Sequence, residues 1–107
     1  MDAQHHLPLA PRDLLILAVL AEAPLHGYGL IKAVEQRSRS GVLLDPANLY
    51  RVLRRMSGLG WIQQVDGGEN SRRRTYAIAP DGQSVLRAEL SRLERLLDQA
   101  KPAVAAG

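Results

Sequence analysis

The segment from Leu44 to Met56 constrains the fold most, because it has the pattern of a capped helix with one apolar side. Asp45 is a good N-cap residue, and Pro46 suits the first helical position, where a missing N–H costs nothing. The apolar residues that follow recur at helical spacing and predict a buried stripe. They are Leu49, Val52, Leu53 and Met56.

The opposite side of this predicted helix is polar and positively charged. Its members are Ala47, Arg51, Arg54 and Arg55, with Asn48 and Tyr50 on the flanks. Three arginines on the outer side of a short, well-started helix suit a polyanion, and we interpret the segment as a candidate recognition helix for DNA. The alternative is that these arginines are simply the solvated side of an amphipathic helix.

The positive charge is concentrated in one part of the chain. The net charge is +3, but the stretch from Pro46 to Ala79 holds six arginines against Asp66 and Glu69, a net +4. A local basic patch of this kind is typical of a nucleic-acid surface. Cysteine is absent, which excludes disulfides, thiolate nucleophiles and Cys-based zinc sites. With no Gly-rich phosphate loop and no Ser-His-Asp arrangement either, we expect no enzyme activity, cofactor or metal.

The chain of 107 residues has the length of one domain. Its longest purely apolar run, Leu14 to Ala21, is too short to cross a membrane. The tripeptide Ala21-Glu22-Ala23 resembles a signal-peptidase site, but no basic region precedes the apolar run. We therefore expect a cytoplasmic protein with no membrane partner.

The remaining patterns predict three helices, a β-hairpin and a final helix. The expected segments are a flexible arm at 1–10, helices at 12–23 and 28–37, strands at 61–65 and 74–78 joined by a Gly-rich turn at 66–71, a last helix at 80–100 and a flexible tail at 101–107. The central helix should stop near Gly58 or Gly60. His26 is expected to pack or hydrogen-bond at the start of the second helix rather than to bind a ligand. The adjacent His5 and His6 make a poor metal site.

This order of elements defines a winged helix-turn-helix domain over residues 11–79, mainly α with a small β-hairpin, followed by a coiled-coil-like C-terminal helix. Leucines in the last helix have the spacing of a coiled-coil seam. They are Leu86, Leu90, Leu93 and Leu97. Because the winged domain has its own three-helix core, we expect a second copy of the chain to cover this seam. The very apolar first helix, through Leu14 and Leu17, is expected to join the same interface.

Short segments along this chain resemble the PadR family of bacterial transcriptional regulators. They are Leu14–Leu17 with Pro24–Tyr28, Asp45–Tyr50, Leu53–Met56, Gly60–Ile62 with Arg72–Tyr76, and Ile78–Gly82. The resemblance covers residues 11–97, and the length is similar to the short branch of the family, in which one C-terminal helix makes the dimer. It implies a homodimeric repressor on an inverted-repeat operator in double-stranded DNA, which a small-molecule effector could release.

The sequence departs from the family pattern at three points. Asn48 stands where small or hydroxyl residues are common, and Arg51 follows Tyr50 where proline is frequent. Both departures concern base preference rather than the fold. The last helix carries no aromatic residue, which argues against the aromatic-stacking ligand site that some family members have.

Different residues of the recognition helix are expected to contact the bases and the phosphates of DNA. Asn48 and Arg51 should lie near base edges, since Asn pairs well with adenine and Arg with guanine. Ala47 would allow close approach or touch a thymine methyl. Arg54 and Arg55, further along the helix, are expected at phosphates, which position the protein without reading sequence.

Two further groups have open interpretations. The Tyr50 hydroxyl could reach a phosphate, or the ring could simply pack. In the predicted wing, Arg72 and Arg74 should share a face while Arg73 points the other way, because side chains alternate along a strand. The tip could enter the minor groove, and a salt-bridged hairpin without DNA contact is the alternative.

Two rival functions remain. A MarR-like regulator shares the wing, but it normally needs extra helices that 107 residues cannot supply. A winged-helix module for protein–protein contacts would use the C-terminal helix and leave the basic side incidental. Salt separates this last case from DNA binding, because phosphate contacts make affinity fall steeply with salt.

Overall fold

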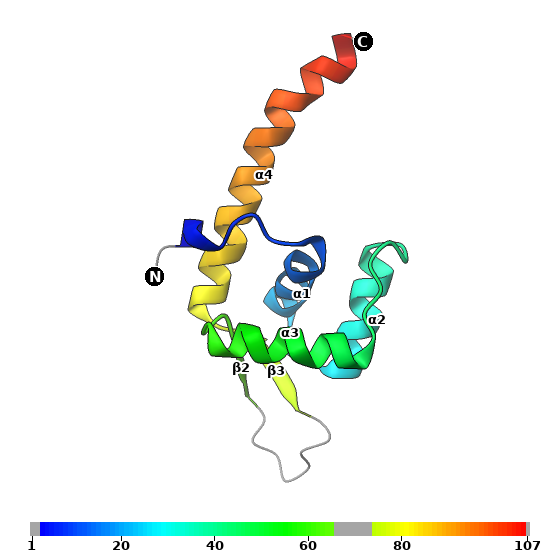
Figure 1. Ribbon diagram of the computed structural model, residues 1–107, viewed down its shortest axis with the longest axis vertical. Coiled ribbons are helices and arrows are strands. Elements are labelled where there is room, and N and C mark those ends of the chain that lie inside the picture. The colour runs from blue at the N-terminus through cyan, green and yellow to red at the C-terminus, as the bar shows by residue number, and fades with distance from the viewer. Residues whose placement is uncertain (1–2, 66–73, 107) are drawn as a thin grey trace.

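The computed structural model describes residues 3–65 and 74–106, and its elements follow the predicted order (Figure 1). They are the 3-10 helix η1 (Ala3–His6), α1 (Pro11–Glu22), β1 (Leu25–His26), α2 (Gly27–Arg37), α3 (Pro46–Gly58), β2 (Ile62–Gln64), β3 (Thr75–Ile78) and α4 (Pro80–Ala106). This mainly helical fold with a small antiparallel sheet confirms the predicted winged helix-turn-helix with an added C-terminal helix.

The core lies between the three helices of the winged domain, the sheet and the first turns of α4. Helix α3 contributes its predicted apolar stripe, and the other helices add one or two fully buried side chains each. The central members are Ile16, Leu17, Leu30, Val34, Leu49, Val52, Leu53, Met56, Trp61 and Val85. The buried stripe of α3 fixes which side of this helix is left to face outwards.

Side chains cap the N-termini of α2 and α3, the two helices of the helix-turn-helix. The Nδ1 atom of His26 accepts a hydrogen bond from the Gly29 N–H at 3.3 Å, as expected for a residue at the start of the second helix. Asp45 accepts from the Asn48 N–H at 2.9 Å, and Pro46 occupies the first turn of α3. These bonds satisfy backbone donors that have no partner within the helix.

The sheet has three strands in the order β1-β3-β2, where the sequence predicted a two-stranded hairpin. β2 and β3 form that hairpin, with Ile62 opposite Ile78. The additional strand β1 pairs with the other edge of β3, and Leu25 lies opposite Tyr76. A two-residue strand is too short to have a hydrophobic period, and its pairing partner is fifty residues away, so the local pattern indicated only a turn. The expected Gly-rich turn at 66–71 lies outside the described residues.

Helix α4 continues to Ala106, so the predicted end at residue 100 is wrong. Pro102 lies inside the helix, and three of the four residues that follow it in α4 are alanines, the strongest helix formers. The helix extends well beyond the winged domain at the end opposite the hairpin (Figure 1). The radius of gyration is 15.3 Å, above the roughly 13 Å of a compact domain of this size. Within residues 3–65 and 74–106, no helix has both the length and the apolar character needed to cross a membrane.

The N-terminal segment is packed on the domain, which corrects the expectation of a flexible arm. Helix η1 lies against α4 (Figure 1). The Leu9 N–H donates to Glu89 Oε2 at 2.7 Å, and the His6 ring meets Trp61 edge-on with centroids 5.2 Å apart. The polar, proline-containing composition suggested mobility, but these partners come from distant parts of the chain and have no local sequence signal.

Candidate nucleic-acid interface

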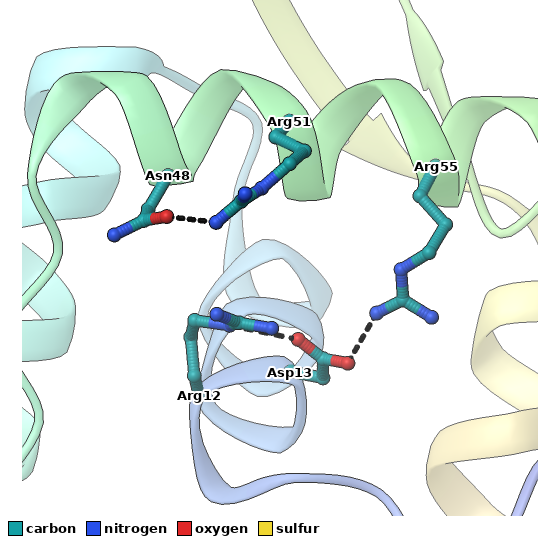
Figure 2. Close-up of polar contacts among 5 residues, drawn as sticks. All are labelled: Arg12, Asp13, Asn48, Arg51 and Arg55. Carbon is teal, nitrogen blue, oxygen red and sulfur yellow. Dashed lines mark hydrogen bonds and ion pairs between the residues drawn. The ribbon is translucent and has the colours of Figure 1, made fainter.

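The exposed side of α3 carries most of the residues expected to meet DNA. Ala47, Tyr50, Arg51 and Arg54 are exposed, and Asn48 is partly buried. Asn48 and Arg51 are linked, because the Asn48 side-chain oxygen accepts from the Arg51 guanidinium (Figure 2). The Nδ2 atom of Asn48 donates to Asp45 at 2.7 Å. The two residues expected near base edges are therefore held together at the start of the helix.

Arg54 and Arg55 are neighbours in sequence but differ in their surroundings. Arg54 faces the hairpin, and it forms no hydrogen bond or ion pair with the part of the chain that the structure describes. Arg55 points to the other side of α3 and forms an ion pair with Asp13 in the first turn of α1 (Figure 2). Its guanidinium carbon also lies 5.9 Å from the centre of the Trp61 ring.

A groove with a volume of about 400 Å³ runs between α3 and the β2–β3 hairpin. Its floor includes apolar side chains of both elements. The polar or charged residues along it are Tyr50, Arg54, Ser57, Gln63, Gln64 and Arg74. Among the residues that the structure describes, no carboxylate lines this groove, and the charged groups are the two guanidinium groups.

Ser57 and Gln63 were not among the residues expected to meet DNA, although both line the groove. Ser57 could have been found, because it follows Arg54 by three residues and Tyr50 by seven, and therefore shares their side of the helix. Gln63 had no such signal. Its position depends on how the hairpin lies against α3, which no local pattern predicts.

Tyr50 combines packing with exposure. Its side chain is about half exposed, and its ring end lies against the start of α2. A Cβ atom built on Gly27 would be 2.9 Å from the Tyr50 hydroxyl oxygen, so a larger residue there would require the Tyr50 side chain to shift. Tyr50 lines the same groove as Arg54.

The wing is described only in part. Arg74, just before β3, is exposed and lines the groove. Arg72 and Arg73 lie outside the described residues, so their expected roles, and the expectation that Arg72 and Arg74 share a face, remain predictions.

The residues expected to make a dimer separate into two groups. Leu17 is fully buried and Leu86 is 7% exposed, both within the core of their own domain, so the expectation that they face a partner is corrected. The three-helix core and the first turns of α4 already enclose them. Leu14 is partly buried against the same core. The uncovered part of the seam consists of Leu90 and Leu97, with Leu93 partly buried between them and exposed Leu96 next to Leu97.

The arrangement defines a class: a winged-helix protein whose third helix and hairpin present arginines around a shared groove. The model of the transcriptional regulator PadR-like family matches residues 16–88. The chain belongs to this family of transcriptional regulators.

Other known proteins are similar to this chain in sequence or in fold. An uncharacterized 37.1 kDa protein in transposon Tn4556 of Streptomyces fradiae is 35% identical over 84 residues, and the chain spans only 23% of that protein. A transcriptional regulator from Clostridium thermocellum superposes with a TM-score of 0.69 at 25% identity, covering 84% of this chain and 89% of that one. Bacillus subtilis PadR, solved in complex with operator DNA, has the same fold, with a TM-score of 0.66, 18% identity, and coverage of 78% of this chain and 47% of that one.

Proposed function

We propose that this chain is a homodimeric repressor that binds an inverted-repeat operator through α3 and the hairpin. The observation that carries the proposal is the position of Arg54 and Arg74 on opposite sides of one groove, which no carboxylate of residues 3–65 and 74–106 lines. Such a groove suits a DNA backbone, because guanidinium groups bind phosphate well. Tyr50, Ser57 and Gln63 add polar groups along it.

In this proposal, the residues that contact DNA bases lie at the start of α3. Ala47 is exposed there beside the linked pair Asn48 and Arg51. Both polar side chains can exchange their mutual hydrogen bond for bonds to base edges in the major groove. On DNA, Arg72 and Arg73 would extend the basic surface along the wing.

Dimer formation supplies the twofold symmetry of the operator. The described chain leaves Leu90 and Leu97 uncovered on α4, with exposed fractions of 44% and 52%. Pairing this surface with a second copy would bury both, and the projecting helix provides room for the partner. The two recognition helices would then meet half-sites about 34 Å apart, one turn of the DNA helix.

Repression would follow from operator occupancy. A small-molecule effector would release the dimer from DNA only if it binds more tightly to the arrangement of the two winged domains in the free dimer than to their arrangement on DNA. A regulator of this kind acts on the chromosome, so we expect it in the bacterial cytoplasm.

Fluorescence anisotropy tests this proposal directly. The full chain is titrated onto a duplex from upstream of its own gene and onto a scrambled duplex, at low and physiological salt. We expect tighter binding to the upstream duplex and a steep loss of affinity with salt, because several phosphates are neutralised. Arg51→Ala should weaken binding by about 5- to 150-fold, the worth of one good base contact. Arg87→Ala, at an exposed position on α4, is the matched control and should bind as the wild type does.

The alternative is a winged-helix module for protein contacts. The uncovered leucines of α4 are compatible with it. Weak binding that is equal on both duplexes and unaffected by Arg51→Ala would favour this alternative, or an operator elsewhere in the genome. A genome-wide selection of bound fragments with the purified protein separates the two.

A further inference from the structure

Arg55 has two partners within its own domain, although it lies on the exposed half of α3. Its guanidinium group bonds the carboxylate of Asp13 (Figure 2). The guanidinium carbon also lies 5.9 Å from the centre of the Trp61 ring. This distance is within the range of a cation–π contact. Arg51 instead bonds Asn48 of the same helix, and so does not tie α3 to another element.

Asp13 is placed to form an ion pair with a guanidinium group. It is only 5% exposed, and a buried carboxylate is costly unless it is paired. Its Oδ1 atom accepts from Arg12 Nε at 3.2 Å, which leaves Oδ2 for Arg55. The N-terminal turn of α1 also favours a negative charge. Among the described residues, Arg12 thus pairs with one oxygen of this carboxylate and Arg55 with the other, so that Oδ2 depends on Arg55.

The N-terminal segment also packs against Trp61 and α4. Leu9, four residues before Asp13, is bonded through its N–H to Glu89 of α4 at 2.7 Å. His6 makes a T-shaped contact with the Trp61 ring that Arg55 lies over. Residues 6–13 therefore connect α4 to the second half of α3.

We propose that Arg55 is a positioning residue for the recognition helix, held by Asp13 and Trp61, and that it does not contact phosphate. Its bonds fix the second half of α3 against α1 and the N-terminal segment, and this sets the angle at which Arg51 and Arg54 meet DNA. The proposal rests on the proposed function and deepens it. The rival is that Arg55 contacts phosphate and is merely restrained by Asp13 in the free protein.

The two cases predict opposite effects of Asp13→Asn on DNA affinity. If Arg55 positions α3, loss of the ion pair weakens binding; if Arg55 contacts phosphate, its release by Asp13→Asn tightens binding. Asn is close in shape to Asp, so the change removes mainly the charge. The measurement is anisotropy on the operator duplex over a series of salt concentrations, with Arg54→Gln as the matched control beside Arg55→Gln.

We expect Asp13→Asn and Arg55→Gln each to weaken binding by about 2- to 30-fold at every salt concentration. The double variant should bind no more weakly than the worse single variant, because both lose the same contact. Neither should change the log–log salt slope. Arg54→Gln should reduce the magnitude of that slope by about 0.9, the signature of one lost phosphate.

Tighter binding by Asp13→Asn, or a slope reduced by about 0.9 in Arg55→Gln, would overturn the proposal. Urea unfolding of the wild type, Asp13→Asn, Arg55→Gln and the double variant gives a readout that needs no DNA, and it should show non-additive losses for Asp13 and Arg55. Additive losses would also overturn the proposal. If the wild type binds no duplex selectively, the proposed function fails, while the urea cycle still decides whether Asp13 and Arg55 act as one unit.

Discussion

Gly82 lies directly against the carbonyl group of Trp61, so closely that a Cβ atom at residue 82 would be 2.1 Å from the carbonyl oxygen. The same oxygen accepts the Ala79 N–H at 2.8 Å. The start of α4 is thus joined to the strand that follows the recognition helix, through a contact that only glycine permits.

Gly82→Ala should destabilise the domain strongly. The added methyl group meets backbone rather than a flexible side chain, so the cost should be at least about 3 kcal/mol, the upper end for overpacking. The measurement is the free energy of unfolding in urea. Gly58→Ala is the matched control, because a Cβ atom there has nothing within 4 Å among the described residues, and this variant should be unchanged or slightly more stable. Equal stability of both variants would contradict the packing described here.

Gly27→Ala should have a smaller effect that depends on Tyr50. The added Cβ would be 2.9 Å from the Tyr50 hydroxyl oxygen, at the free end of a side chain that can move. We expect a loss of about 1 kcal/mol in urea unfolding. The loss should be smaller when Gly27→Ala is made in a Tyr50→Phe background, because that background lacks the hydroxyl group. An equal loss in the two backgrounds would show that the hydroxyl contact is not the cause.

Stability should fall at acid pH through Glu89. The hydrogen bond from Arg92 lowers the pKa of Glu89 below its usual value, and the Leu9 N–H adds to this, while burial opposes both. A carboxylate whose pKa is lower in the folded state stabilises the fold fully above its unfolded pKa of 4.5, and this contribution is lost as pH falls through the folded pKa. The difference in stability between the wild type and Glu89→Gln should therefore shrink below pH 4.5.

The check is urea unfolding of both proteins from pH 7 to pH 3. At neutral pH, Glu89→Gln should cost about 1.5 to 3 kcal/mol, the range for a hydrogen bond to a charged group. Glu22→Gln is the comparison: its pKa is also lowered, by Arg37, but both side chains are exposed, so the change should matter little. A constant difference between wild type and Glu89→Gln across the pH range would refute the prediction.

Leu97→Glu should separate the proposed dimer. In a twofold interface the change removes two buried leucines, worth at least about 1.5 kcal/mol each, and weakens the dimer by about a hundredfold or more. Sedimentation velocity at micromolar concentration gives the oligomeric state. Gln99→Glu, on the opposite side of α4, carries the same new charge and should leave the dimer intact. A wild type that sediments as a monomer would exclude the dimer itself.

The sequence predicted those features whose cause is local. Asp45 and Pro46 marked the start of α3, and the apolar stripe from Leu49 to Met56 identified its buried side. The hairpin followed from two apolar runs around a Gly-rich segment. The order of these elements was then enough to define the winged helix-turn-helix fold.

The features that were missed depend on contacts between distant residues. Asp13 and Arg55 are 42 positions apart, so nothing near Arg55 distinguished it from Arg54. Leu9 and Glu89 are separated by 80 positions, which hid the packing of the N-terminal segment. Heptad spacing identified the apolar stripe of α4, but it could not tell where the domain stops covering it, between Leu86 and Leu90.

Trp61 is the only tryptophan of the chain, and it lies where α3, the N-terminal segment and α4 come together. The protein therefore contains a single indole fluorophore, beside three tyrosines, and this indole has a guanidinium group over its ring and an imidazole in T-shaped contact with it. Any movement of α3 relative to α4 changes the surroundings of that indole. Its emission offers an optical signal for such movement in the unlabelled protein, on addition of DNA or of any small molecule.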